Sequence, residues 1–231
     1  MGSRRLKVVS YLGSQALFKD MSAPELARIA AASSVRRLSR GEEMFHAGQV
    51  CEGLYFVIDG MIKLYAKASS GQEKVIEVIG AGGCVSESLM FSDGAHSVNA
   101  SVLMDVQLLV VPKDVLVHEI EHNAGLAMRL LTGLSRRMNG LVKDIEAVTL
   151  HSGVKRVVDY QLHSPVVGDV HRADKDLTVS LPASKGTIAS LLSVTPEHFS
   201  RILHDLQAQG LIEVERRHIH IRDAHGLAQF S

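Results

Sequence analysis

Residues 184–210 read SKGTIASLLSVTPEHFSRILHDLQAQG, which predicts two short helices joined by a tight turn. Ser184 is a suitable N-cap for the first helix. The second begins with TPE at residues 195–197, which supplies a hydroxyl N-cap, a proline at the first helical position and an acid near the positive end of the helix dipole. Gly210 suits the C′ position that ends this helix. We therefore expect a helix-turn-helix.

The second predicted helix has an apolar face and a polar face. Four polar residues recur at spacings that place them on one side of the helix: Glu197, Ser200, Arg201 and His204. A polar stripe on such a helix fits the DNA major groove, where Arg201 could read guanine and Glu197 could accept from cytosine. Apolar runs at 211–214 and 219–221 predict a β-hairpin wing. A plain helical hairpin with a solvated charged face is the alternative.

Other residues of the same stretch are candidates for phosphate contacts, because hydroxyls, basic groups and helix N-termini bind anions. The chain has 25 basic and 25 acidic residues, so its net charge does not indicate nucleic-acid binding. The prediction of DNA binding therefore rests on the local arrangement of these residues. Aromatic residues make up only 4%, which argues against stacking platforms for single strands. The predicted DNA-binding residues are Ser184, Lys185, Thr195, Glu197, His198, Ser200, Arg201 and His204.

The N-terminal half has a different sequence pattern. Residues 22–33 predict a short helix with a capping box formed by Ser22 and Glu25. Residues 35–111 then alternate short apolar runs with glycines, which predicts a β-barrel or jelly roll. Within this region, Asp59-Gly60 between two β-rich runs predicts a two-residue hairpin turn.

Residues 124–150 change to a helical period. Apolar residues recur there in a heptad pattern that predicts a coiled-coil seam between two copies of the chain. A helix packed on its own barrel is the alternative. A further helix at 154–162, a polar loop at 163–176 and a strand at 177–181 follow. The seam positions are Ala124, Ala127, Leu131, Leu134, Met138, Leu141, Ile145 and Val148.

The segment HEIEH at residues 118–122 matches the zinc-hydrolase motif, with Glu119 as the general base. The position of a third metal ligand holds Met128, a poor zinc ligand, and no other catalytic fingerprint occurs, so we expect no enzyme. Two cysteines, Cys51 and Cys84, are too few for a disulfide framework or an iron–sulfur cluster. Apolar runs are too short for a membrane span, and we expect a cytoplasmic protein with reduced thiols.

Several motifs resemble those of the CRP/FNR superfamily of bacterial transcription regulators. They are Gly41-Glu42 with Gly48, the segment 54–65 around Gly60, Gly83 with SESLMF at 86–91, the heptad helix, and the helix-turn-helix. The resemblance implies an α+β protein with a cyclic-nucleotide-binding-type β-barrel at 1–123, a dimerisation helix at 124–150 and a winged helix-turn-helix at 151–231. The implied partners are double-stranded DNA, a second copy of the chain and RNA polymerase.

The spacing of Glu197, Ser200 and Arg201 is similar to that of FNR-type recognition helices. This similarity implies an inverted repeat of TTGAT-like half-sites. Pro196 stands where the CRP pattern has arginine, which argues against a CRP-type half-site.

The resemblance also bears on the effector, whose pocket it places at Gly83, Glu87, Ser88 and Ser97. Members that bind cAMP pair its phosphate with an arginine, for which this chain has Ser97, so we do not expect cAMP binding. Residues GQEK, SESLMF and TPEHFSR are similar to the nitric-oxide-responsive DNR/NNR branch, which implies haem. The sequence singles out no axial ligand. A cyclic-nucleotide-responsive regulator remains the alternative, and a zinc hydrolase using HEIEH a remote one.

Overall fold

The computed structural model describes residues 2–89, 94–163 and 177–230. Most of the predicted polar loop, and Met90 and Phe91 of the SESLMF motif, lie outside these residues. The chain divides into two compact units, one formed by residues 1–64 and 79–141 and the other by 65–78 and 142–231. No helix in the described ranges combines the length and the apolar character needed to cross a membrane.

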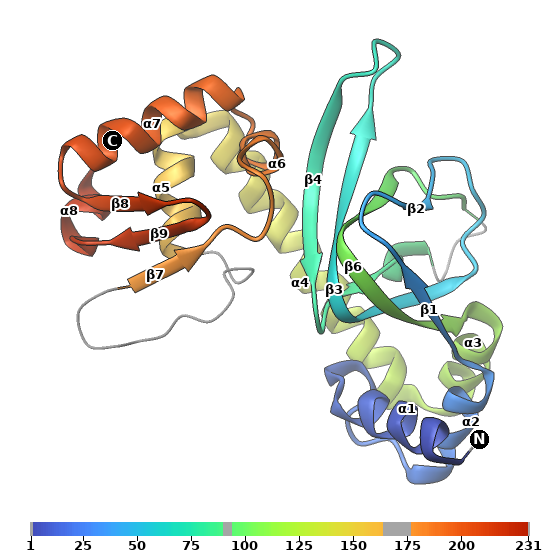
Figure 1. Cartoon of the computed structure of the whole chain (residues 1–231). Helices are drawn as coiled ribbons and strands as arrows, with labels where there is room; N and C mark the ends of the chain where they lie inside the picture. The colour runs from blue at the N-terminus through green and yellow to red at the C-terminus, as the bar shows by residue number, and fades with distance from the viewer. Residues whose placement is uncertain (1, 90–93, 164–176, 231) are drawn as a thin grey trace. The chain divides into compact units, whose positions relative to one another are not determined.

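The N-terminal half of the chain forms a six-stranded sheet (Figure 1), most of whose residues belong to the first unit. Its main path runs β1-β6-β3-β4, while β2 pairs with β6 and β5 pairs with β3. The β-rich texture predicted for the N-terminal half is therefore confirmed. The strands are β1 (Ser34–Leu38), β2 (Glu43–Phe45), β3 (Gly53–Lys67), β4 (Glu73–Gly80), β5 (Cys84–Val85) and β6 (Asn99–Pro112).

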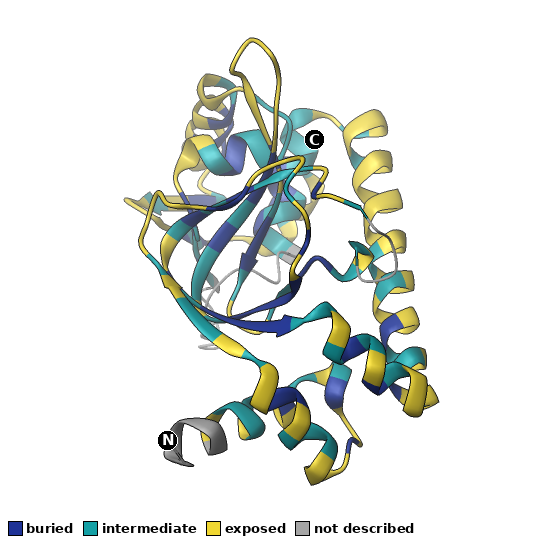
Figure 2. Ribbon diagram, turned by 90° about the vertical axis from the view of Figure 1, so that its right-hand side faces the viewer, coloured by how far each residue is buried: buried dark blue, intermediate teal, exposed yellow. Residues whose placement is uncertain are grey.

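Alternate residues of β3 belong to two different cores. Leu54 and Phe56 pack in a cluster with the helices, whereas Tyr55 and Val57 pack in a second cluster made by the strands themselves. This follows from the two-residue period of a strand, which sends successive side chains to opposite faces. Residues on both faces of β3 are consequently buried, and Figure 2 shows buried residues in dark blue along several strands.

The hairpin predicted at Asp59-Gly60 is wrong, because β3 continues without a break through these two residues. Gly60 has a φ of +86°, and a Cβ atom there would lie 2.1 Å from the carbonyl oxygen of Asp105. The glycine thus permits a close approach of the β6 backbone, which is the other role of glycine in strands. The chain reverses instead at residues 68–72, where the Ala68 N–H donates to the Gln72 carbonyl at 2.9 Å.

Helices pack against one face of this sheet, where their apolar residues share a core with Leu54 and Phe56 of β3. The capping box predicted at Ser22 and Glu25 is present at the start of α2, since Glu25 accepts hydrogen bonds from both the N–H and the hydroxyl of Ser22 at 2.6 Å. The first helix was not among the elements expected from the sequence. The helical elements of this part are α1 (Gly2–Ser14), η1 (Ala16–Phe18), α2 (Ala23–Ala32), η2 (Glu87–Leu89), α3 (Lys113–His122) and α4 (Ala124–Leu150).

The second unit carries the predicted helix-turn-helix and wing. Strands β8 and β9 pair antiparallel, and β7 joins the other edge of β9. Arg216 has a φ of +54° in the tight turn between β8 and β9. The elements are α5 (Gly153–His163), β7 (Leu177–Ser180), α6 (Lys185–Leu191), α7 (Pro196–Ala208), β8 (Ile212–Glu215), β9 (His218–Ile221) and α8 (Ala224–Gln229).

Candidate nucleic-acid interface

Hydroxyl caps begin both helices of the helix-turn-helix. The Ser184 Oγ accepts a hydrogen bond from the Thr187 N–H at 3.1 Å, and the Thr195 Oγ1 accepts from the His198 N–H at 3.2 Å. Between the helices, Ser193 adopts a φ of +56° and the Val194 N–H donates to the Ala189 carbonyl at 3.0 Å. The local sequence therefore fixes where each helix starts and how tightly the chain turns.

Helix α7 separates its side chains as the pattern predicts. Its four large apolar residues are at most 3% exposed: Phe199, Ile202, Leu203 and Leu206. The four residues of the predicted polar stripe, Glu197, Ser200, Arg201 and His204, are all exposed. The described part of the chain thus presents a continuous polar ridge whose carboxylate, hydroxyl, guanidinium and imidazole groups match the donors and acceptors of base edges and phosphates.

The remaining predicted contacts differ in their surroundings. Lys185 is exposed at the start of α6. Ser184 and Thr195 are exposed, but their hydroxyls already serve as helix caps. His198 is half-buried beside Gly153, where a Cβ atom would lie 3.1 Å from the imidazole Cε1. Of this group, Lys185 is the side chain best placed for a phosphate.

Arg156 on α5 is a supporting residue that sequence reasoning missed. Its guanidinium donates to the carbonyls of Leu192 at 2.8 Å and Ser193 at 3.1 Å, and also to the His151 carbonyl at 2.6 Å. These bonds fix the turn between α6 and α7 from a helix more than 30 residues away. Its position in a predicted helix gave no signal of this role.

Of the four predicted effector residues, two are half-buried and two are exposed. Glu87 is half-buried, and its carboxylate lies 3.8 Å from the guanidinium of Arg137 on α4. Ser88 and Ser97 are both exposed, and Gly83 packs against Ile79. Burial raises the pKa of the Glu87 carboxyl, although Arg137 opposes this shift. Sequence reasoning missed Arg137, since it lies 50 positions downstream.

Two further groups near the sheet bear on a metal or cofactor. Burial raises the pKa of the Cys84 thiol, which keeps it protonated and a poor ligand. His96 is buried with its ring stacked on Phe45 at a centroid distance of 3.6 Å. Its Nε2 has no hydrogen-bond partner among the described residues. Burial lowers the pKa of His96, so the imidazole is held neutral with a lone pair available.

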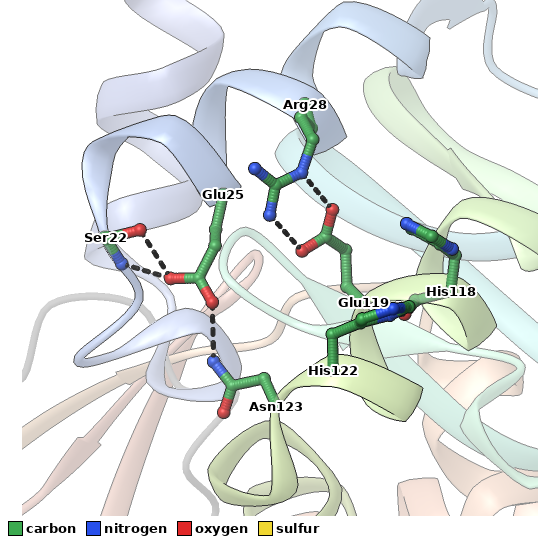
Figure 3. Close-up of polar contacts among 7 residues, drawn as sticks. All are labelled: Ser22, Glu25, Arg28, His118, Glu119, His122 and Asn123. Carbon is green, nitrogen blue, oxygen red and sulfur yellow. Dashed lines mark hydrogen bonds and ion pairs between the residues drawn. The ribbon is translucent and has the colours of Figure 1, made fainter.

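The zinc-hydrolase geometry is not formed at HEIEH. Glu119, the expected general base, is 2% exposed and accepts two hydrogen bonds from Arg28, at 2.6 and 2.9 Å. Figure 3 shows this carboxylate turned toward Arg28 of α2. His118 and His122 are exposed. The glutamate is therefore a structural partner of α2 and does not share a reaction site with the histidines.

Comparisons with known proteins agree with this architecture. A cyclic nucleotide-binding domain model matches residues 35–123, and a Crp-like helix-turn-helix domain model matches residues 155–230. The cyclic AMP receptor protein of Thermus thermophilus is 24% identical over 203 residues, which cover 87% of this chain and 90% of that protein.

Solved structures extend the match to nearly the whole chain. The structure of FixK2 from Bradyrhizobium japonicum has a TM-score of 0.75 at 19% identity, covering 84% of this chain and 95% of its own. DNR from Pseudomonas aeruginosa is 31% identical, with a TM-score of 0.51 and coverage of 97% and 98%. With both domains matched in order, and with the helix-turn-helix and wing formed, this chain belongs to the CRP/FNR family of DNA-binding transcription regulators, which are not enzymes.

Proposed function

We propose that this regulator binds DNA as a homodimer and reads an FNR-like inverted repeat. The observation that carries the proposal is the exposed ridge of α7 formed by Glu197, Ser200 and Arg201. Its backbone is fixed by the Thr195 cap and by a buried opposite face. A rigid helix with exposed polar groups is what readout of the major groove requires. In a two-fold dimer, the half-sites lie about one turn of DNA, roughly 34 Å, apart.

The long helix α4 supports the homodimer. Leu126 and Leu130 are buried in the helical core of the first unit, whereas most residues of the predicted seam are exposed. The alternative, a helix packed on its own barrel, explains why Leu126 and Leu130 are buried, but it does not explain the exposed apolar residues of the seam. Exposed apolar side chains in a heptad pattern are stabilised by a second, identical helix. The outward residues, 48–67% exposed, are Leu131, Met138, Leu141, Ile145 and Val148.

Binding to designed duplexes tests the DNA proposal. Fluorescence anisotropy compares an inverted repeat of TTGAT half-sites with the same sequence carrying half-sites moved by five base pairs, and with random DNA. We expect the correctly spaced repeat to bind at least about 10³-fold more tightly than random DNA at physiological salt. Equal affinity for the three duplexes would overturn sequence-specific reading.

For the effector, we propose nitric oxide acting through haem. The support comes from His96, whose buried, neutral imidazole has the unpaired nitrogen that an axial ligand needs. The aromatic rings of Phe45 and Tyr55 lie beside it. His96 would hold the group, which supplies an iron atom that takes up nitric oxide. Because the Nε2 atom is buried, its surroundings must rearrange before it can reach an iron atom.

Absorbance spectra of the anaerobic protein, reconstituted with haem and then exposed to nitric oxide, test this effector. We expect stoichiometric binding, a band shift with nitric oxide, and loss of both in His96→Ala. Binding that survives in His96→Ala would overturn the assignment of this ligand. Failure of the wild-type protein to bind haem would overturn the effector itself, while leaving the DNA proposal in place.

One observation favours the alternative of a cyclic nucleotide. Arg137 supplies a cation beside Glu87, although the sequence offers no arginine at the position of Ser97. An anionic phosphate bound there would gain a guanidinium partner, at the cost of competing with the Glu87 carboxylate. Calorimetry with cAMP and cGMP decides between the effectors, and micromolar binding that is lost in Arg137→Ala would replace the haem proposal.

A further inference from the structure

A group of metal-ligating side chains lies outside both the recognition ridge and the predicted effector residues. His118, Glu121 and His122 are exposed on α3, and each offers a ligand atom such that all three atoms lie within 4.8 Å of one another. The family assignment leaves this group without a role. It belongs to the HEIEH segment, whose hydrolase interpretation fails because Glu119 faces elsewhere.

Helical geometry brings these ligands together without strain. His118 and His122 are four residues apart, and Glu121 is three residues after His118, so the three share neighbouring positions on the helix surface. The imidazole centroids of the two histidines lie 4.5 Å apart. The side chains therefore converge with the backbone already in place.

The tautomer of His122 favours metal binding. Its Nδ1 lies 2.8 Å from the carbonyl oxygen of His118. Because a carbonyl oxygen only accepts, Nδ1 carries the proton and Nε2 keeps its lone pair. A hydrogen bond from the second ring nitrogen to a backbone carbonyl is the usual way in which a ligating histidine is oriented. Glu121 and His122 also lie in the last turn of α3, where the helix dipole favours a cation.

We propose that His118, Glu121 and His122 form a binding site for a divalent transition-metal ion, with Zn²⁺ as the best match. Two imidazoles and a carboxylate suit zinc, and a water completes its tetrahedral shell. Tetrahedral zinc with bonds near 2 Å holds its ligand atoms about 3.3 Å apart, so the exposed side chains close by roughly 1.5 Å or less. Rotamer adjustment of exposed groups supplies a movement of this size.

A hydrolase would need Glu119 as its base, but this carboxylate pairs with Arg28 and does not face the three ligands, so we propose no hydrolytic role for the site. Its position suggests a structural one. His122 precedes Asn123, whose side-chain oxygen caps α4 by accepting from the Leu126 N–H at 3.1 Å and whose amide donates to Glu25 at 2.9 Å (Figure 3). A metal bound across the last turn of α3 therefore fixes the junction from which α4 begins.

Zinc titration of the full-length, chelator-stripped protein by calorimetry tests the site. We expect the wild type to bind one zinc ion. The affinity should fall by about tenfold or more in His118→Ala and in His122→Ala, because losing even a hydrogen-bond partner of a metal ligand lowers metal affinity by that factor. His225→Ala removes an exposed histidine from α8 and serves as the matched control, with unchanged affinity. Affinity in His118→Ala equal to that of the control would overturn the proposal.

Two further measurements distinguish binding at this site from zinc bound elsewhere on the chain. Zinc should raise the melting temperature of the wild type and of His225→Ala but not that of His118→Ala, whose circular dichroism should match the wild type because the histidine is exposed. Glu119→Gln should retain zinc binding, whereas Glu121→Gln should weaken it. Loss of zinc in Glu119→Gln with the fold intact would overturn the assignment of the ligands.

Discussion

Arg28 and Glu119 form a bidentate ion pair across 91 residues of chain, with the Arg28 Nε 2.6 Å from Oε1 and Nη2 2.9 Å from Oε2 of the glutamate. The carboxylate is 2% exposed and the guanidinium 53% exposed. The pair joins α2 to α3 and accounts for a buried charge that would otherwise be costly. It also explains why an apparent catalytic glutamate has no catalytic surroundings.

Removing the guanidinium should destabilise the first unit. In Arg28→Ala, Glu119 keeps its buried position without its partner, and we expect a loss of about 2 kcal/mol in the free energy of unfolding. Arg28→Lys should recover only part of this, because an ammonium cannot make the two parallel bonds. Urea denaturation measures both. Arg36→Ala, which breaks the exposed pair with Glu52 at 3.7 Å, is the control and should change stability by about 0.5 kcal/mol or less.

Acid should weaken the contact between α2 and the start of α4. Hydrogen bonds from the side chain and backbone of Ser22, and from Asn123, lower the pKa of Glu25 to about 2, from an ordinary value of 4.5. A carboxyl with a lowered pKa stabilises the fold fully above pH 4.5 and loses this contribution as the pH falls toward 2. Denaturation at stepped pH should therefore show a smaller decline over this interval in Glu25→Gln. An identical decline in both proteins would contradict the assignment.

Arg201→Ala tests base reading by the ridge. We expect a loss of roughly 1–3 kcal/mol on the specific repeat and a relaxed preference at one base pair of each half-site, because a guanidinium reads guanine through two bonds. Anisotropy on the specific repeat and on single-base variants measures both effects. Equal losses on specific and random duplexes would show that Arg201 contacts only the backbone.

Lys185→Ala should behave differently, since an exposed lysine at the start of α6 fits a phosphate contact. We expect weaker binding to every sequence by a similar factor, and a slope of log affinity against log salt that falls by about 1 in magnitude. The measurement is a salt titration on specific and random DNA. A selective loss on the specific repeat would assign Lys185 to base reading instead.

Ile145→Glu tests the seam of α4. Ile145 is 67% exposed, so the charge should leave the isolated fold unchanged. In a two-fold seam, each copy would bury this charge against its equivalent, which should weaken the dimer by roughly 3 kcal/mol or more. Light scattering after size-exclusion chromatography should show a monomer. Asn139 is exposed on the same helix but is not one of the seam positions, so Asn139→Glu should leave the dimer intact.

The signals that begin the helices of the helix-turn-helix are local, and from them the sequence predicted the structure well. The caps at Ser184 and Thr195 and the polar stripe of α7 depend on residues within a single helix and its first turn, and all are present. Asp59-Gly60 shows the limit of this approach. The same dipeptide suits a hairpin turn or a close approach between strands, and only the position of Asp105 on β6 selects the second.

The order of barrel, long helix and winged helix-turn-helix can be predicted from the sequence, because hydrophobic period and capping act over a few neighbouring residues. The folded chain was needed to show that Glu119 faces Arg28, that Arg137 reaches Glu87, and that His96 is buried against Phe45. Each of these relationships joins different elements of the fold. Their geometry is set by how helices and strands pack, and no spacing along the chain encodes it.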